Sequence, residues 1–133
     1  MKKTILIFLS ISLITFLNSC SNNDDETIVQ PTDYQGIWNG TYSGDDHGTW
    51  TATVDDNGVA TGSATSEIYS ATYSLNGTVN LENGQFSATI GEASTGAEFS
   101  GQFSVSNTET TGSGSWTNES LNMTGVWEGS MEK

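Results

Sequence analysis

The chain of 133 residues contains no arginine, and three lysines stand against 16 aspartates and glutamates. Proteins that bind nucleic acid draw most of their affinity from Lys and Arg side chains that neutralise phosphates. A chain with a formal net charge of −13 repels phosphates, so the composition excludes nucleic acid as a partner. The same repulsion excludes direct attraction to anionic lipid headgroups.

Cysteine and histidine each occur once, as Cys20 and His47. A single cysteine forms no disulfide within the chain, so the domain depends on its hydrophobic core for stability. A zinc site needs three or four His, Cys or acidic ligands, and nucleophilic catalysis needs a base beside the nucleophile. His47 lies between Asp46 and Gly48, where we expect an ordinary turn residue. The sequence therefore predicts no catalytic residue, no metal site and no cofactor.

Carboxylates are the one abundant class of reactive side chain, and two roles for them stay open. Paired carboxylates at one rim would serve a glycan hydrolase, which is the alternative to a binding function. Calcium candidates are Asp45 with Asp46, and Asp55 with Asp56, although each pair offers few of the roughly six to eight oxygen ligands that calcium takes. We expect all four acids to be exposed, ionised residues of hairpin turns.

The first 20 residues have the layout of a secretory signal. Lys2 and Lys3 precede an apolar run over residues 5–17, and a small residue, Ser19, precedes Cys20. The apolar run is shorter than the roughly 20 residues that a helix needs to span a bilayer.

Residues 17–20, Leu-Asn-Ser-Cys, resemble the lipobox of bacterial lipoproteins. The only cysteine of the chain falls at the position that this motif requires. The resemblance implies a signal peptide at residues 1–19, cleavage between Ser19 and Cys20, and lipidation of Cys20 by acyl chains such as palmitate. Several acyl chains on one residue anchor a protein firmly to a membrane. An ordinary signal peptide with an incidental cysteine is the alternative.

Residues 20–33 are polar and acidic, lack periodicity and contain the only proline, Pro31. We expect them to form a flexible tether behind the lipidated cysteine. The acidic cluster at residues 24–26 resembles the export signal of surface lipoproteins in Bacteroidota, which implies an outer-membrane protein facing the extracellular side. A solvated spacer is the alternative reading of this cluster. The mature chain would carry 16 acids and one base, Lys133, for a formal charge of −15.

Residues 34–133 hold all 15 glycines together with 29 serines and threonines, and apolar or glycine positions alternate with polar ones. Such alternation is typical of strands with one solvated face. Strands are predicted at residues 36–44, 50–54, 59–65, 73–79, 86–90, 97–105, 112–116 and 123–131. Turn signals separate them, and Asn57-Gly58 predicts a type I′ hairpin turn. The link at residues 66–70 contains no glycine, and its boundary is the hardest to place from the sequence.

Eight strands with short connections predict an all-β, antiparallel meander. An open sheet would leave two edges and an apolar face uncovered, whereas closure into a small barrel removes both problems. Large residues are followed two positions later by glycine, as in Trp38-x-Gly40 and Trp127-x-Gly129, so rings of one strand can fit over glycines of a neighbour. We expect the first and last strands to pair and to bury Trp38 and Trp127. A two-sheet β-sandwich is the alternative fold.

The domain resembles the calycin group, which includes lipocalins and avidins. The resemblance consists of a Gly-x-Trp at residues 36–38, a meander of eight strands and a late tryptophan strand. Residues 48–63 are similar in rhythm to the first hairpins of avidin-like barrels, and transferrin-binding-type lipoprotein barrels share the glycine-rich style. The resemblance implies the barrel fold, and no ligand contact of the family is carried over to a residue of this chain.

Aromatic side chains are the remaining candidates for a ligand site. The candidates are Trp38, Tyr42, Trp50, Tyr73, Trp116 and Trp127. As stacking groups they would suit a sugar or a small aromatic compound, and as core residues they would stabilise a barrel without disulfides. A filled interior is favoured, because the apolar inventory is small against the entropic cost of folding. The function expected is a binding or interaction module for a small molecule, a glycan or a basic protein, without enzymatic activity.

Overall fold

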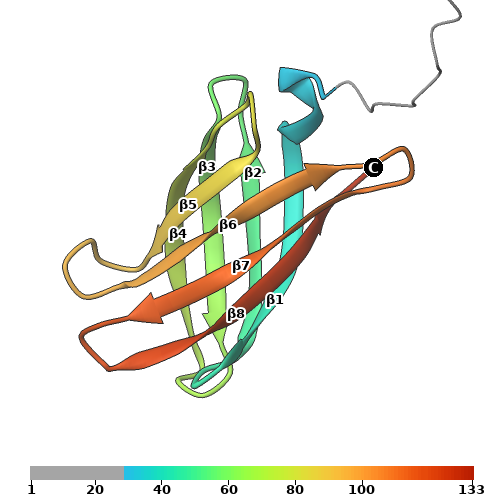
Figure 1. Cartoon of the computed structure of the whole chain (residues 1–133). Helices are drawn as coiled ribbons and strands as arrows, with labels where there is room; N and C mark the ends of the chain where they lie inside the picture. The colour runs from blue at the N-terminus through green and yellow to red at the C-terminus, as the bar shows by residue number, and fades with distance from the viewer. Residues whose placement is uncertain (1–28) are drawn as a thin grey trace, which may run out of the picture.

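The computed structural model describes residues 29–133, which form a closed antiparallel barrel of eight strands (Figure 1). The strands are β1 (Gly36–Gly44), β2 (Gly48–Val54), β3 (Val59–Ser66), β4 (Ala71–Val79), β5 (Gln85–Ile90), β6 (Ala97–Val105), β7 (Thr110–Asn118) and β8 (Met123–Met131). Each strand pairs with the next along the chain, and β1 also pairs with β8. The predicted eight-stranded meander barrel is confirmed, and its closure excludes the two-sheet sandwich.

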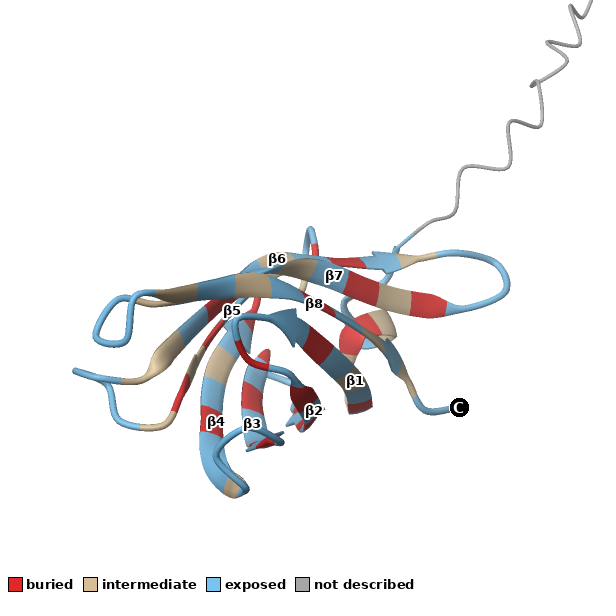
Figure 2. Ribbon diagram, turned by 90° about the horizontal axis from the view of Figure 1, so that it is seen from below, coloured by how far each residue is buried: buried red, intermediate tan, exposed pale blue. Residues whose placement is uncertain are grey.

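Alternation along each strand decides which residues enter the barrel. In β2 the apolar residues Trp50, Ala52 and Val54 are buried, while the threonines between them are exposed. Figure 2 shows the same alternation of buried and exposed positions along several strands. A shift of one residue would expose every ring of the strand to water, so this pattern fixes the register of the pairing.

The barrel closes through β1 and β8, from Trp38 opposite Met131 to Gly44 opposite Gly125. Trp38 is fully buried and Trp127 is 2% exposed. The predicted pairing of the first and last strands, and the burial of both tryptophans, are therefore confirmed.

Three tryptophans share one arrangement. Each ring lies over a glycine of the adjacent strand, and its indole N–H donates a hydrogen bond to a backbone carbonyl on the strand beyond. The three sets are Trp50 over Gly40 to Glu128, Trp116 over Gly125 to Ser43, and Trp127 over Gly114 to Ser100, with N···O distances of 3.2, 3.0 and 3.1 Å. A side chain at any of these glycines would occupy the space of the ring. Gly129 also faces the ring of Trp50, so this geometry explains the glycines of the Trp38-x-Gly40 and Trp127-x-Gly129 patterns.

One end of the barrel, where the chain enters, is closed by a short 3-10 helix, η1 (Pro31–Tyr34) (Figure 1). Tyr34 is 3% exposed and lies against Gly84 in the β4–β5 turn. Its backbone carbonyl accepts a hydrogen bond from the indole N–H of Trp38 at 3.0 Å. Residues 31–33, assigned by the sequence to the flexible tether, are thus part of the folded domain. The predicted signal peptide, Cys20 and the tether up to residue 28 lie outside the described residues.

The turn between β2 and β3 differs from the type I′ turn that Asn57-Gly58 predicts. Gly58 has a φ of +78°, but Asn57 does not adopt a positive φ. The carboxylate of Asp55 accepts hydrogen bonds from the backbone N–H groups of Asn57 and Val59, both at 2.9 Å. This side-chain bonding favours a longer loop with glycine in its left-handed position. Within residues 29–133, no helix is long and apolar enough to cross a membrane.

Candidate functional site

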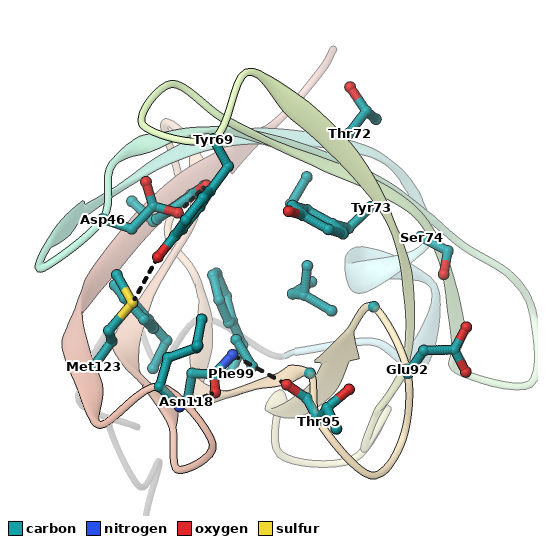
Figure 3. Close-up of a pocket in the computed structure, with 18 residues that line it drawn as sticks. Asp46, Tyr69, Thr72, Tyr73, Ser74, Glu92, Thr95, Phe99, Asn118 and Met123 are labelled. Atoms are coloured by element: carbon teal, nitrogen blue, oxygen red, sulfur yellow. Dashed lines mark hydrogen bonds between the residues drawn. The ribbon is translucent and has the colours of Figure 1, made fainter.

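A cavity of about 470 Å³ opens at the end of the barrel opposite η1 (Figure 3). Residues of the β1–β2, β3–β4, β5–β6 and β7–β8 connections surround its opening, and we call it the mouth cavity. Its volume lies within the range of roughly 300–1,000 Å³ that is usual for small-molecule sites.

The floor of the mouth cavity is apolar and aromatic. Tyr42, Phe99 and Trp116 form it together with Ala64 and Ile90, and all five residues are buried. The ring centroids of Tyr42 and Phe99 are 5.7 Å apart, and those of Phe99 and Trp116 are 6.2 Å apart. These three rings contact one another and form a rigid base for a bound molecule.

Deeper in the barrel, a second layer of rings fills the interior. Trp38 stacks on Phe103 with ring centroids 3.7 Å apart, and Phe103 stacks on Phe86 at 4.8 Å. Trp50 and Trp127 complete this layer, with ring centroids 5.6 Å apart at nearly perpendicular planes. The mouth cavity is therefore a shallow cup above a packed core.

The rim of the mouth cavity exposes large apolar side chains. Tyr69 is 50% exposed, Tyr73 is 41% exposed and Leu121 is 55% exposed. The hydroxyl of Tyr69 donates a hydrogen bond to the Met123 sulfur at 3.6 Å, which connects the β3–β4 turn to β8. Grouped apolar side chains around a hollow mark a binding surface more often than isolated ones do.

Asp46, expected to be an exposed turn residue, is buried at the mouth cavity, and this expectation was wrong. Its Oδ1 accepts hydrogen bonds from the backbone N–H of His47 at 2.7 Å and from the Ser66 hydroxyl at 3.0 Å. Its Oδ2 accepts one from the Tyr42 hydroxyl at 3.3 Å. These donors replace water around the carboxylate and allow its burial. Asp45, Asp55 and Asp56 are exposed, as predicted.

The Tyr42 hydroxyl is a permanent donor in this network. Burial, and next the negative charge of Asp46, raise the pKa of Tyr42 to about 12. Both causes disfavour the phenolate, so Tyr42 stays protonated at neutral pH. Its single proton is shared between the Asp46 carboxylate and the backbone carbonyl of Thr65, whose oxygen is 3.2 Å away.

The β3–β4 turn positions Tyr69 without the glycine that marks other turns. Ser70 adopts a φ of +49°, and the Ser66 hydroxyl accepts a hydrogen bond from the backbone N–H of Tyr69 at 3.0 Å. The same Ser66 hydroxyl donates to Asp46. One buried serine therefore connects the Asp46 carboxylate to the backbone of the aromatic rim.

His47 lies on the outer side of the β1–β2 turn. Its Nε2 is 3.1 Å from a carboxylate oxygen of Glu67, and both side chains are more than half exposed. An exposed pair of this kind contributes little to stability. His47 does not line the mouth cavity.

The six aromatic candidates divide into two groups. Tyr42, Tyr73 and Trp116 line the mouth cavity, so their role as ligand contacts stays a prediction. The other three candidates, Trp38, Trp50 and Trp127, belong to the packed core and line no part of the mouth cavity. Sequence reasoning did not place Asp46, Tyr69 and Phe99 at the cavity. Alternation does not show at which height of the barrel Phe99 lies, and Asp46 and Tyr69 belong to turns, where no alternation applies.

Two of the calcium candidates accept hydrogen bonds from other residues of the chain, one of them on a different strand. Asp45 accepts the backbone N–H of Thr124 at 2.9 Å, and Asp56 accepts the side-chain amide of Asn57 at 2.9 Å. Among the described residues, no three or more His, Cys, Asp or Glu side chains gather where they could hold a metal ion.

Comparison with known proteins yields no relative for this chain: no family model matches it, and neither the curated proteins nor the solved structures give a match.

Proposed function

We propose that this chain is a lipid-anchored lipoprotein of the outer-membrane surface whose barrel binds a small molecule in the mouth cavity. The observation that carries the proposal is the cavity itself, with three aromatic rings below, exposed tyrosines at the rim and one buried carboxylate. An apolar pocket with a few convergent polar groups is the usual form of a small-molecule site. Its small volume and cup shape suit a small molecule better than a glycan chain or a basic protein.

The position of the N-terminal segment supports presentation of the site to the outside. The chain enters the barrel at η1, and the mouth cavity opens at the other end (Figure 1). A tether that runs from a lipidated Cys20 to η1 would leave the opening directed away from the membrane. The orientation thus agrees with a surface receptor for a ligand in the surrounding medium.

Binding without turnover is favoured over hydrolysis by the placement of the acids. Asp46 is the only buried carboxylate among residues 29–133. Exposed acids occur at both ends of the barrel, with Asp55 and Glu82 at the closed end and Glu92 at the mouth. A carboxylic acid that protonates a glycosidic oxygen needs burial or a close like charge to raise its pKa, together with a second carboxylate across the bond.

The binding function is tested by filling the cavity. A neutral apolar fluorophore such as Nile red is expected to bind the purified chain saturably. The substitution Ala97→Trp places an indole at the cavity wall and should weaken binding at least tenfold, because the indole occupies the space of the dye. The control Ile37→Trp adds the same indole at an exposed position of β1 near the closed end and should bind like the native chain. Equal affinities of the two variants, or no saturable binding, would contradict the proposal.

The anchor is tested separately at Cys20. Cells that produce the Cys20→Ser variant should no longer attach labelled palmitate to the protein, and the protein should leave the membrane fraction, because the lipidated thiol is lost. The neighbouring substitution Ser21→Ala, which keeps the thiol, should preserve both properties. Continued palmitate labelling of Cys20→Ser would show that the lipobox resemblance is incidental.

A further inference from the structure

Among the described residues 29–133, the buried carboxylate of Asp46 has no cationic partner. The only lysine or arginine in residues 29–133 is Lys133, whose amino group donates to the carbonyl of Thr108 in the β6–β7 turn, beside the closed end. The imidazole of His47 pairs with Glu67 on the outer side of the turn. Asp46 therefore receives three neutral donors and keeps its negative charge uncompensated at the wall of the mouth cavity.

Aromatic rings stand around the same part of the mouth cavity. Figure 3 shows Asp46 and Tyr69 on one side of the opening, with the hydroxyl of Tyr73 directed into it. The ring of Tyr42 contacts Trp116 below them, with ring centroids 5.9 Å apart. The faces of tyrosine and tryptophan rings attract cations, and a carboxylate among such rings is the arrangement that recognises ammonium groups.

The charges around the opening select against anions. Each of the four connections at this end carries at least one exposed acid, and no lysine or arginine of the described chain lies there. These acids are Asp45, Glu67, Glu92 and Glu119. Their summed field concentrates cations at the opening and repels carboxylates and phosphates.

The remaining walls and the floor accept an apolar body. Ile90, Phe99, Leu121 and Met123 line them, and the packed layer below stops a ligand from entering deeper. We infer that the ligand of the mouth cavity is an amphiphilic amine, with its ammonium group on Asp46 between the rim tyrosines and a small aromatic or apolar body against Phe99. This inference rests on the proposed binding function and specifies its ligand class.

Three matched probes test the inference on the purified full chain by isothermal titration at neutral pH. They are tryptamine, its neutral analogue indole-3-ethanol and its anionic analogue indole-3-propionate. Because only the ammonium adds the attraction of a full positive charge to the Asp46 carboxylate and to the faces of the surrounding rings, tryptamine should bind at least tenfold more tightly than the alcohol. The anion should bind most weakly of the three.

Two variants test which side chains bind the ammonium group. In Asp46→Asn the preference for the amine over the alcohol should fall to within about threefold, because the amide carries no charge. Asp56→Asn makes the same change in an exposed turn at the closed end and should keep the preference. Tyr69→Leu alters only a half-exposed rim residue and should weaken amine binding more than alcohol binding. If thermal melting shows that Asp46→Asn does not fold, the Tyr69→Leu variant alone tests whether the mouth cavity prefers the amine.

The failures of the two proposals are distinguishable. Saturable binding of tryptamine and indole-3-ethanol with equal affinity would overturn the amine inference and leave a small-molecule site in place. An amine preference that survives both Asp46→Asn and Tyr69→Leu would overturn it as well. If neither the three probes nor the neutral dye binds saturably, the binding function and the amine inference both fail.

Discussion

Replacing Trp127 by alanine is expected to lower the free energy of unfolding by about 3–5 kcal/mol. Trp127 is 2% exposed, and its ring contacts the rings of Phe86 and Phe103 with centroids 5.2 and 6.1 Å away. Alanine would leave a cavity at the centre of the aromatic layer and remove the donor to the Ser100 carbonyl. A small domain is stabilised by about 5–15 kcal/mol in total, so this loss approaches complete unfolding.

Urea denaturation followed by circular dichroism measures the effect, with Val126→Ala as the control. Val126 is the preceding residue of β8 and is 59% exposed, so its truncation should change the free energy of unfolding by less than about 0.5 kcal/mol. A native-like unfolding midpoint for Trp127→Ala would show that the ring contributes nothing to the core.

The sequence was sufficient to predict the barrel because two local signals agree with the global fold. Alternation fixes which face of each strand is apolar, and the glycines two positions after Trp38 and Trp127 indicate close approach of rings and backbone. The absence of a helix-period pattern leaves no other cover for the apolar face. Closure through β1 and β8 then follows from the need to remove sheet edges.

The height of a residue within the barrel is what alternation does not reveal. Tyr73 and Leu75 share one face of β4, yet Tyr73 is 41% exposed at the mouth and Leu75 is 1% exposed in the core. Some of the aromatic candidates therefore line the mouth cavity, and others form the core at a deeper level of the same barrel. Trp116 lies at the floor of the cavity, and Trp127 lies in the filled layer.

The remaining differences between the sequence predictions and the structure lie in the turns, because the conformations of turns depend on tertiary contacts. Asp46 is buried because Tyr42 and Ser66, on two different strands, provide donors for it. Ser70 adopts a positive φ, which the sequence does not predict because no glycine stands at this position. The 3-10 helix η1 packs on the barrel through the buried Tyr34, and the polar sequence of residues 31–33, predicted to belong to the tether, does not indicate this.

The second large effect is expected from adding a side chain where the barrel has none. In Gly114→Val, the new Cβ would overlap the Ser100 carbonyl oxygen and stand 2.7 Å from the indole nitrogen of Trp127. Both atoms belong to the hydrogen bond that crosses Gly114, so valine displaces the ring and breaks that bond. Overpacking together with one lost hydrogen bond should cost about 2–4 kcal/mol.

Strand propensity acts in the opposite direction, and the comparison with Ser113→Val separates the two effects. Valine is a better strand residue than glycine by an amount within the ~1 kcal/mol span of measured β propensities, which is smaller than the expected clash. Ser113 precedes Gly114 on β7 and is exposed, so valine there gains propensity without a clash and should leave stability unchanged or slightly raised. Thermal melting of both variants shows whether the steric clash or the strand propensity has the larger effect on stability. A Gly114→Val variant as stable as Ser113→Val would mean that Trp127 does not lie over this glycine.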